Sequence, residues 1–324
     1  MANSSDYVVG VDFGATKIRA GVFDPSLRCV GMAKLSTKAL RGPDAVIARL
    51  ARCVQYAVDE ADTELKKVRA VGVGAPGKVD HESGAVLVAP NLGWKDVPLR
   101  RELEKALGRP VSVANDCGAA MLGVYVAELD AKPGDAAGIF IGTGIGGGIV
   151  LNGEPYSGTH RLASEIGHMV LDVNGPKCGC GNKGCFEALA SRTAIFRKIQ
   201  NAVKRGEKTV LTEMLGDALE DMRSGDLRKA IRRGDQLVAH VVEEAAEFTG
   251  VAVANLINLF RPEIVVLGGG VIQALADEMM GTIVEVAWEH VLGGKAADIE
   301  IVASKLGDQA GITGAALLTK QQFK

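Results

Sequence analysis

A glycine-rich turn between two apolar stretches occurs twice in this sequence, and this duplication limits the possible folds more than any other feature. The first copy spans residues 7–23, with Asp12-Phe-Gly-Ala-Thr-Lys17 between its apolar stretches. The second spans residues 138–152, around Gly142-Thr-Gly-Ile-Gly-Gly-Gly148. Short apolar stretches bounded by glycine are typical of buried strands. The duplication therefore predicts two related α/β lobes that face a cleft.

Strands and helices alternate in the rest of the chain. Helical spacing of apolar residues covers 43–61, 99–107, 118–129, 235–260, a stretch ending near 290, and 309–320. Short apolar stretches at 71–74, 111–114, 264–267 and 299–303 predict strands. This alternation is the pattern of an α/β fold. Because no low-complexity linker divides the chain, we infer the boundary between the lobes only from the motifs, near Cys117.

The charge balance argues against two classes of partner. The chain has 37 basic and 39 acidic residues, for a formal net charge of −2. Proteins that bind nucleic acids or anionic membranes usually carry a basic excess. Residues 1–6 are polar and lack the apolar run of a signal peptide, and no stretch approaches the ~18 apolar residues of a membrane span. We therefore expect a cytoplasmic protein that binds neither nucleic acid nor membrane.

The glycine-rich turns are candidate phosphate sites. Both offer backbone N–H groups, and the first adds the Thr16 hydroxyl, the Lys17 ammonium and the Asp12 carboxylate, which suits a divalent cation. An ordinary hairpin turn is the alternative. The second turn contains the string of a dinucleotide-binding loop, but that loop must lead into a helix, whereas a strand follows here. A third glycine run, 268–270, either packs against a flat ring such as adenine or only begins a helix.

Asn115 and Asp116 directly follow the strand expected at 111–114. An Asp at a strand end can accept the proton of a hydroxyl nucleophile, as phosphoryl transfer requires. The alternative is a helix cap, because Asn and Asp are both favoured there. The segment 72–78 resembles a phosphate loop, but Val79 stands where the magnesium-binding hydroxyl belongs. We interpret it as a loop that contacts the other substrate.

A metal site is predicted from one histidine and three closely spaced cysteines: His168, Cys178, Cys180 and Cys185. Three thiolates and an imidazole make a closed tetrahedral Zn²⁺ site, which is structural because it leaves no position for water. Chance grouping of the thiols is the alternative. Glu165 and Glu187 flank these residues, so a loop held by the metal would present both carboxylates to a polyhydroxylated ligand.

Together these motifs resemble the ROK family of repressors and kinases, and within it the bacterial glucokinases. The pairing of His168 with Cys-x-Cys-Gly-x-x-Gly-Cys-x-Glu is highly specific to this family. The resemblance extends from residue 8 to about 314 and rests on these stretches in family order: Asp12–Lys17, Asn91–Pro98, Asn115–Asp116, Gly142–Gly148, Glu165–His168, Cys178–Glu187 and Gly268–Gly270.

The resemblance implies a two-lobed actin-like ATPase fold, of the ribonuclease H-like kind, with a central ligand cleft. Its last helix returns to the first lobe, which implies lobes of 1–117 with about 305–324, and of 118–304. The implied activity is ATP-dependent phosphorylation of glucose at the 6-hydroxyl. The implied cofactors are catalytic Mg²⁺ and structural Zn²⁺, and the implied assembly is a homodimer or homotetramer.

The resemblance also assigns roles to residues, with Asp116 as the general base. Contacts to the sugar are expected from Gly77, Asn91, Asn115, Asp116, Glu165, His168 and Glu187. Contacts to ATP are expected from Gly10, Asp12, Gly14, Thr16, Lys17, Gly142, Thr143, Gly144, Gly146, Gly147, Gly268, Gly269 and Gly270. His168 would bind the metal through one ring nitrogen and face the sugar with the other.

Three residues depart from the family's usual pattern: Ala15 and Ser164 replace usual glycines, and Cys117 follows Asp116. None removes a functional group, but Ser164 and Cys117 lie near the expected sugar pocket. The alternatives are a kinase for fructose, mannose, allose or an N-acetylhexosamine, and a sugar sensor. Repressor relatives carry a helix-turn-helix domain first, for which a strand near residue 7 leaves no room. The stretch Asn-Leu-Gly-Trp at 91–94 favours glucose.

Overall fold

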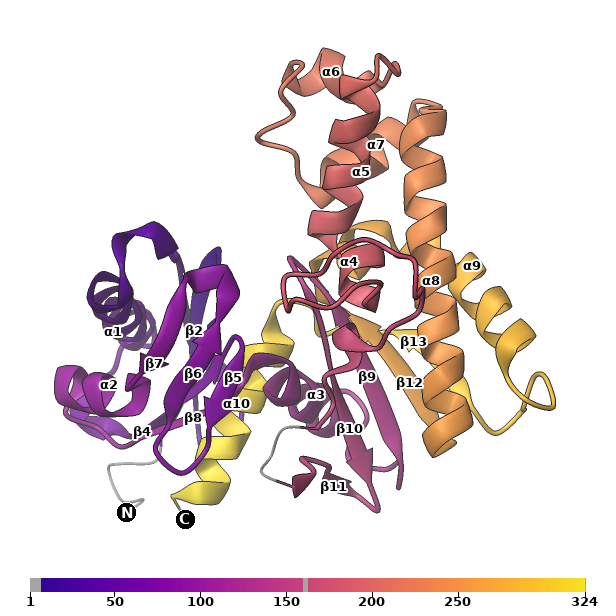
Figure 1. The fold of residues 1–324 in the computed structure, drawn as a ribbon. Coiled ribbons are helices and arrows are strands. Elements are labelled where there is room, and N and C mark those ends of the chain that lie inside the picture. Colours follow the sequence, from indigo (N-terminus) through magenta and orange to yellow (C-terminus); the bar gives the residue numbers. More distant parts are fainter. Residues whose placement is uncertain (1–6, 160–162, 324) are drawn as a thin grey trace. The chain divides into compact units, whose positions relative to one another are not determined.

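The computed structural model describes residues 7–159 and 163–323, which form two compact units (Figure 1). Unit 1 comprises Met1–Lys132, Ser157–Ala163 and Asp308–Lys324, and unit 2 comprises Pro133–Tyr156 and Ser164–Gly307. The chain therefore leaves unit 1 twice and ends in it. Residues 1–6, on which the expectation about a signal peptide depends, lie outside the described part.

Five strands form the main sheet of unit 1: β1 (Tyr7–Phe13), β2 (Lys17–Phe23), β3 (Cys29–Ser36), β4 (Val68–Ala75) and β8 (Val111–Asn115). Their spatial order is β3-β2-β1-β4-β8. The first three pair antiparallel, and β4 and β8 then add in parallel. A second, small antiparallel sheet consists of β5 (Lys78–Asp80), β6 (Ala85–Ala89) and β7 (Trp94–Val97).

The helices of unit 1 are α1 (Pro43–Glu60), α2 (Leu99–Leu107), α3 (Asp116–Ala127) and α10 (Gln309–Gln322). Successive residues of a strand point to opposite faces of the sheet, so β1 can pack against α1 on one face and α10 on the other. Val9 shares a core with Val46 and Leu50 of α1. Gly10 lies against α10, where a Cβ atom would overlap the carbonyl oxygen of Ile312. A glycine is therefore required in mid-strand for α10 to pack on the sheet.

The boundary expected at residue 117 falls inside unit 1, because α3 belongs to this unit over its whole length. The reason is the close packing of α3 on the C-terminal helix α10. A Cβ atom on Gly314 of α10 would overlap the carbonyl oxygen of Ala119 in α3, so only a glycine permits this approach. The chain consequently passes into unit 2 only after Lys132.

Unit 2 repeats the sheet topology of unit 1. Its strands are β9 (Ala136–Ile141), β10 (Ile145–Leu151), β11 (Glu154–Pro155), β12 (Ile264–Gly268) and β13 (Glu300–Ala303). Their order is β11-β10-β9-β12-β13, with the first three antiparallel and the last two added in parallel. The same arrangement in both units confirms the two-lobed α/β fold predicted from the duplicated turn.

The helices of unit 2 are η5 (Ile166–His168), α4 (Phe186–Ala190), α5 (Arg192–Lys204), α6 (Val210–Leu215), α7 (Ser224–Arg232), α8 (Gln236–Phe260) and α9 (Gly269–His290). In Figure 1, α8 and α9 run side by side, and α9 also contacts β9, β12 and β13. Gly250 of α8 permits close approach, because a Cβ atom there would meet the carbonyl oxygen of Ile283 in α9. Within the described ranges, no helix has the length and apolar character needed to span a bilayer.

Candidate functional site

The turn between β1 and β2 is closed by hydrogen bonds on both sides. The N–H of Gly14 donates to the carbonyl oxygen of Lys17 at 2.9 Å. Thr37 is fully buried, and its hydroxyl donates to the carbonyl oxygen of Gly14 at 2.6 Å, while its N–H donates to that of Thr16 at 2.9 Å. Thr16 and Lys17 are exposed. The two residues of this turn that the sequence assigns to phosphate are therefore accessible to solvent.

Asp12 lies at the end of β1, opposite Arg19 of β2. Nη1 of Arg19 donates to Oδ2 of Asp12 at 3.0 Å, and the same guanidinium pairs with Asp308. Burial raises the pKa of Asp12, and Arg19 opposes this rise. An oxygen ligand next to the turn fits a hard divalent cation such as Mg²⁺. Gly10, also expected at the nucleotide, lies deeper in β1 against α10, and helix packing accounts for it.

The structure separates the two roles considered for Asn115 and Asp116. Asn115 is the N-cap of α3: its Oδ1 accepts from the N–H groups of Cys117 at 3.0 Å and Gly118 at 3.1 Å. Asp116 occupies the first turn of α3, and its Oδ1 accepts from the N–H of Cys117 at 2.8 Å. Asn115 is therefore the N-cap, whereas Asp116, the candidate base, accepts one backbone N–H inside the first turn.

The other sugar-contacting residues expected in unit 1 lie on neighbouring segments. Nδ2 of Asn115 donates to the carbonyl oxygen of Gly77 at 3.2 Å. Gly77 has a φ of 84°, and a Cβ atom there would overlap the carbonyl oxygen of Val88 in β6. Asn91 is exposed in η3 (Pro90–Leu92), directly after β6. The cap of α3 thus connects to the loop before β5, which in turn packs on the segment that carries Asn91.

In unit 2, the glycine-rich turn between β9 and β10 is fastened to α4 and α5. The N–H of Gly142 donates to the carbonyl oxygen of Gly144 at 2.8 Å, and the N–H of Arg192 donates to that of Gly142 at 3.0 Å. Oε2 of Glu187 accepts from the N–H of Ile145 at 2.9 Å. The same oxygen lies where a Cβ atom on Gly144 would be, so the carboxylate can approach only a glycine.

The remaining expected nucleotide glycines differ in the space around them. Gly146 and Gly147 lie in β10, and Gly147 faces the side chain of Ile166, which a Cβ atom would overlap. Gly268 packs on the ring of Phe140, and Gly269, with a φ of 87°, on the backbone of Ile141. Gly270 is exposed, with no atom within 4 Å of a Cβ position. Of these glycines, Gly270 borders space that a ligand can enter.

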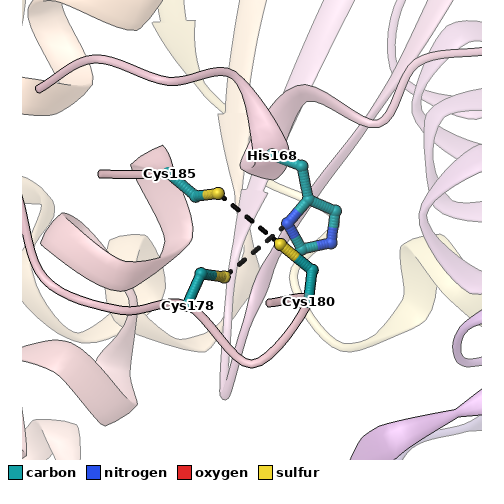
Figure 2. Close-up of side chains that lie close together, drawn as sticks. All are labelled: His168, Cys178, Cys180 and Cys185. Carbon is teal, nitrogen blue, oxygen red and sulfur yellow. Dashed lines mark hydrogen bonds between the residues drawn. The ribbon is translucent and has the colours of Figure 1, made fainter. Parts of the chain in front are cut away.

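The four predicted metal ligands converge in unit 2, as Figure 2 shows for His168, Cys178, Cys180 and Cys185. Their ligand atoms all lie within 4.8 Å of one another. Nδ1 of His168 lies 3.8 Å from Sγ of Cys178, and the sulfur atoms of Cys180 and Cys185 lie 3.6 Å apart. A tetrahedral zinc site with Zn–S bonds of about 2.3 Å separates its ligand atoms by roughly 3.3–3.8 Å. The donor set and its spacing therefore fit Zn²⁺.

Two carboxylates accompany the cysteine cluster. Glu165 immediately precedes η5, and its carbonyl oxygen accepts from the N–H of His168 at 3.0 Å. Burial raises the pKa of Glu165, His168 opposes the rise, and repulsion from Glu187 adds to it. Oε1 of Glu187 lies 3.9 Å from Sγ of Cys178. The expected sugar-contacting residues of unit 2 are thus brought together beside the cluster.

Sequence reasoning missed the residues that fasten the two turns. Thr37 holds the first turn from 23 positions away, and Thr193 holds the second by donating its hydroxyl to the carbonyl oxygen of Thr143 at 2.7 Å. Arg192 bonds to both the backbone and the side chain of that second turn. Neither threonine belongs to a motif. The only signal for Arg192 was its place just after Ser191, a favoured helix cap.

Comparisons with known proteins find relatives over nearly the whole chain. The ROK family model matches residues 8–322. A glucokinase of Thermotoga maritima is 33% identical, over 98% of each chain. A putative xylose repressor of a Caldicellulosiruptor species is 29% identical, over 95% of this chain and 76% of the repressor. A solved ROK family glucokinase of Streptomyces griseus, in complex with glucose and AMPPNP, superimposes with a TM-score of 0.87 at 32% identity, over 97% of this chain and 99% of the other. Because the family model covers nearly the whole chain, the protein belongs to the ROK family.

Proposed function

We propose that this ATP-dependent sugar kinase transfers the terminal phosphoryl group of ATP to the 6-hydroxyl of glucose. The sugar oxygen attacks the γ-phosphorus, the bond to the β-phosphate oxygen breaks, and Asp116 takes the hydroxyl proton. The products are ADP and glucose 6-phosphate. Mg²⁺ bound near Asp12 would neutralise phosphate charge, and the backbone N–H groups of both glycine-rich turns would bind the phosphates.

The observation that carries this proposal is that Asn115, and not Asp116, is the N-cap at the start of α3. Oδ1 of Asn115 accepts from the backbone N–H groups of Cys117 and Gly118, and its amide also binds the Gly77 loop. Oδ1 of Asp116 also accepts from the N–H of Cys117 at 2.8 Å, but Asn115 accepts from both Cys117 and Gly118, so the cap does not require Asp116. An ionised carboxylate at this position can accept a proton at neutral pH. The residues proposed to bind the sugar or to shape its site are Gly77, Asn91, Asn115, Glu165, His168 and Glu187.

A coupled assay of ADP release over a panel of hexoses tests the substrate. Glucose should give the highest kcat/KM, and ³¹P NMR should identify the product as the 6-phosphate. Fructose, mannose, allose and the N-acetylhexosamines are the competing substrates. A higher kcat/KM for any of these would show that the protein is a kinase whose preferred substrate is that hexose and not glucose.

We also propose that His168, Cys178, Cys180 and Cys185 hold a structural Zn²⁺. When bound, such an ion supplies folding free energy to a loop that has few apolar contacts of its own. Elemental analysis after extensive dialysis should find about one zinc per chain. Folded, active protein without zinc would disprove this assignment.

A sugar sensor is the second candidate, because a relative of this chain carries the name of a repressor. The near-neutral charge of this chain, −2, supports a protein without a nucleic-acid partner. A sensor would bind a hexose but release no ADP in the coupled assay. We further propose a homodimer or homotetramer, for which light scattering gives the mass directly.

A further inference from the structure

Arg192 reaches the glycine-rich turn of unit 2 with both its backbone and its side chain. Its N–H donates to the carbonyl oxygen of Gly142 at 3.0 Å, and its Nη2 donates to Oγ1 of Thr143. Thr193, the next residue, donates its hydroxyl to the carbonyl oxygen of Thr143 at 2.7 Å. The first two residues of α5 therefore fix both the backbone and the side chain of Thr143.

The contact with Arg192 decides which way the Thr143 hydroxyl can point its proton. A threonine hydroxyl has one proton to donate and two lone pairs that accept. A guanidinium has only donors, so Thr143 must accept in this bond. Its own proton is then directed to some other acceptor. On a phosphate-binding turn, that acceptor is a phosphate oxygen.

Arg192 also brings a positive charge to this turn. Among the described residues, no carboxylate forms an ion pair with its guanidinium, although other arginines of the chain have such partners. The side chain is half-buried, and burial lowers its pKa. An arginine nevertheless stays protonated in proteins, so its charge is retained. A bound polyphosphate chain would supply the missing negative partner.

We propose that Arg192 is a positioning residue for the nucleotide: it orients the Thr143 hydroxyl as a donor to a phosphate oxygen and adds positive charge to the turn. This inference rests on the proposed role of residues 142–147 in binding ATP. It assigns no contact with the sugar to Arg192. If Arg192 only held the turn in place, its substitution would lower stability and weaken the binding of ATP and of the sugar equally.

Direct binding of AMPPNP, measured by calorimetry without sugar, tests the proposal on Arg192→Gln and Arg192→Lys. The matched control is Arg197→Gln on the same helix, whose guanidinium donates to the carbonyl oxygen of Ala188 at 2.8 Å, away from the turn. Loss of one charge-assisted hydrogen bond should raise the Kd of Arg192→Gln about tenfold. Lysine keeps the charge but not the planar fork, so Arg192→Lys should bind with intermediate affinity.

Steady-state kinetics and a double-mutant cycle separate positioning from a purely structural role. Arg192→Gln should raise the KM for ATP about tenfold and change that for glucose less than about twofold. Because Arg192 acts through Thr143, the losses in Arg192→Gln and Thr143→Ala should be less than additive when combined. Additive losses, equal rises in both KM values, or a Kd like that of Arg197→Gln would overturn the proposal.

The binding measurement also distinguishes this inference from the proposed function. Wild-type protein that binds AMPPNP but phosphorylates no hexose would disprove the kinase and leave the role of Arg192 intact. Wild-type protein that binds no nucleotide would disprove the inference. If Arg192→Gln does not fold, Arg192→Lys against Arg197→Lys decides, and equal affinity in that pair would overturn the proposal.

Discussion

Glu187 accepts a hydrogen bond from the backbone N–H of Ile145, with 2.9 Å between its Oε2 and that nitrogen. Its other oxygen lies 3.9 Å from Sγ of Cys178. A single carboxylate therefore connects the cysteine cluster to the glycine-rich turn of unit 2. The sequence alone places Glu187 only beside the metal and the sugar, whereas the structure adds a contact to the candidate nucleotide turn. A change in the cluster should consequently reach both substrates.

Cys180→Ser tests this connection. Loss of one of the four ligands should release the metal, disorder the loop and withdraw Glu187 from Ile145. Zinc content should fall, and the KM values for glucose and for ATP should both rise. Cys29→Ser is the matched control, because Cys29 lies in β3 of unit 1, where its thiol contacts the carbonyl oxygen of Gly31 at 3.6 Å. Loss of zinc with an unchanged KM for ATP would show that Glu187 does not transmit the change.

Two neighbouring glycines at the start of α9 should respond differently to alanine. Gly269→Ala forces a side chain into a φ of 87° and against the backbone of Ile141, so the free energy of unfolding should fall by more than about 1 kcal/mol. Gly270→Ala meets no atom within 4 Å and adds helix propensity, so stability should hold or rise. If adenine packs on Gly270, its alanine variant should still raise the KM for ATP. An unchanged KM for ATP would show that residues 268–270 only begin a helix and do not contact adenine.

The stability of unit 1 should depend on pH through Asp24. This carboxylate accepts from the hydroxyl of Ser26 at 2.6 Å and from the N–H of Arg28 at 3.0 Å, and these bonds lower its pKa from 3.8 to about 2. Because the folded state has the lower pKa, the stabilisation is complete above about pH 4 and is lost as pH falls from 3.8 towards 2.

Urea unfolding of Asp24→Asn and wild type between pH 3 and 7 measures this effect. The variant should be less stable at neutral pH, and the difference should narrow below about pH 4. Asp59→Asn removes an exposed carboxylate of α1 and controls for loss of charge. A difference between wild type and Asp24→Asn that stays constant over the whole range would contradict the assignment.

The sequence predicted the elements whose pattern is local and missed those fixed by distant contacts. Both glycine-rich hairpins and α2 were predicted because apolar residues recur at strand or helix spacing within a few positions. β3 was missed because apolar and polar residues do not alternate regularly in its sequence, Cys-Val-Gly-Met-Ala-Lys-Leu-Ser, and the structure buries only Gly31 of the eight. The close spacing of the cysteines in the sequence correctly predicted that their side chains converge with His168. The fastening of Thr143 by Arg192, from 49 positions away, leaves no local pattern.

The general-base role of Asp116 is tested most directly by the rate of phosphoryl transfer in Asp116→Asn. Asparagine keeps the size and hydrogen bonding of aspartate but cannot accept the proton from the sugar hydroxyl. Relative to wild type and the Asp59→Asn control, kcat should fall by about 10²–10⁴ while the Kd for glucose stays within about twofold. A kcat for Asp116→Asn close to the wild-type value would contradict the assignment of Asp116 as the base.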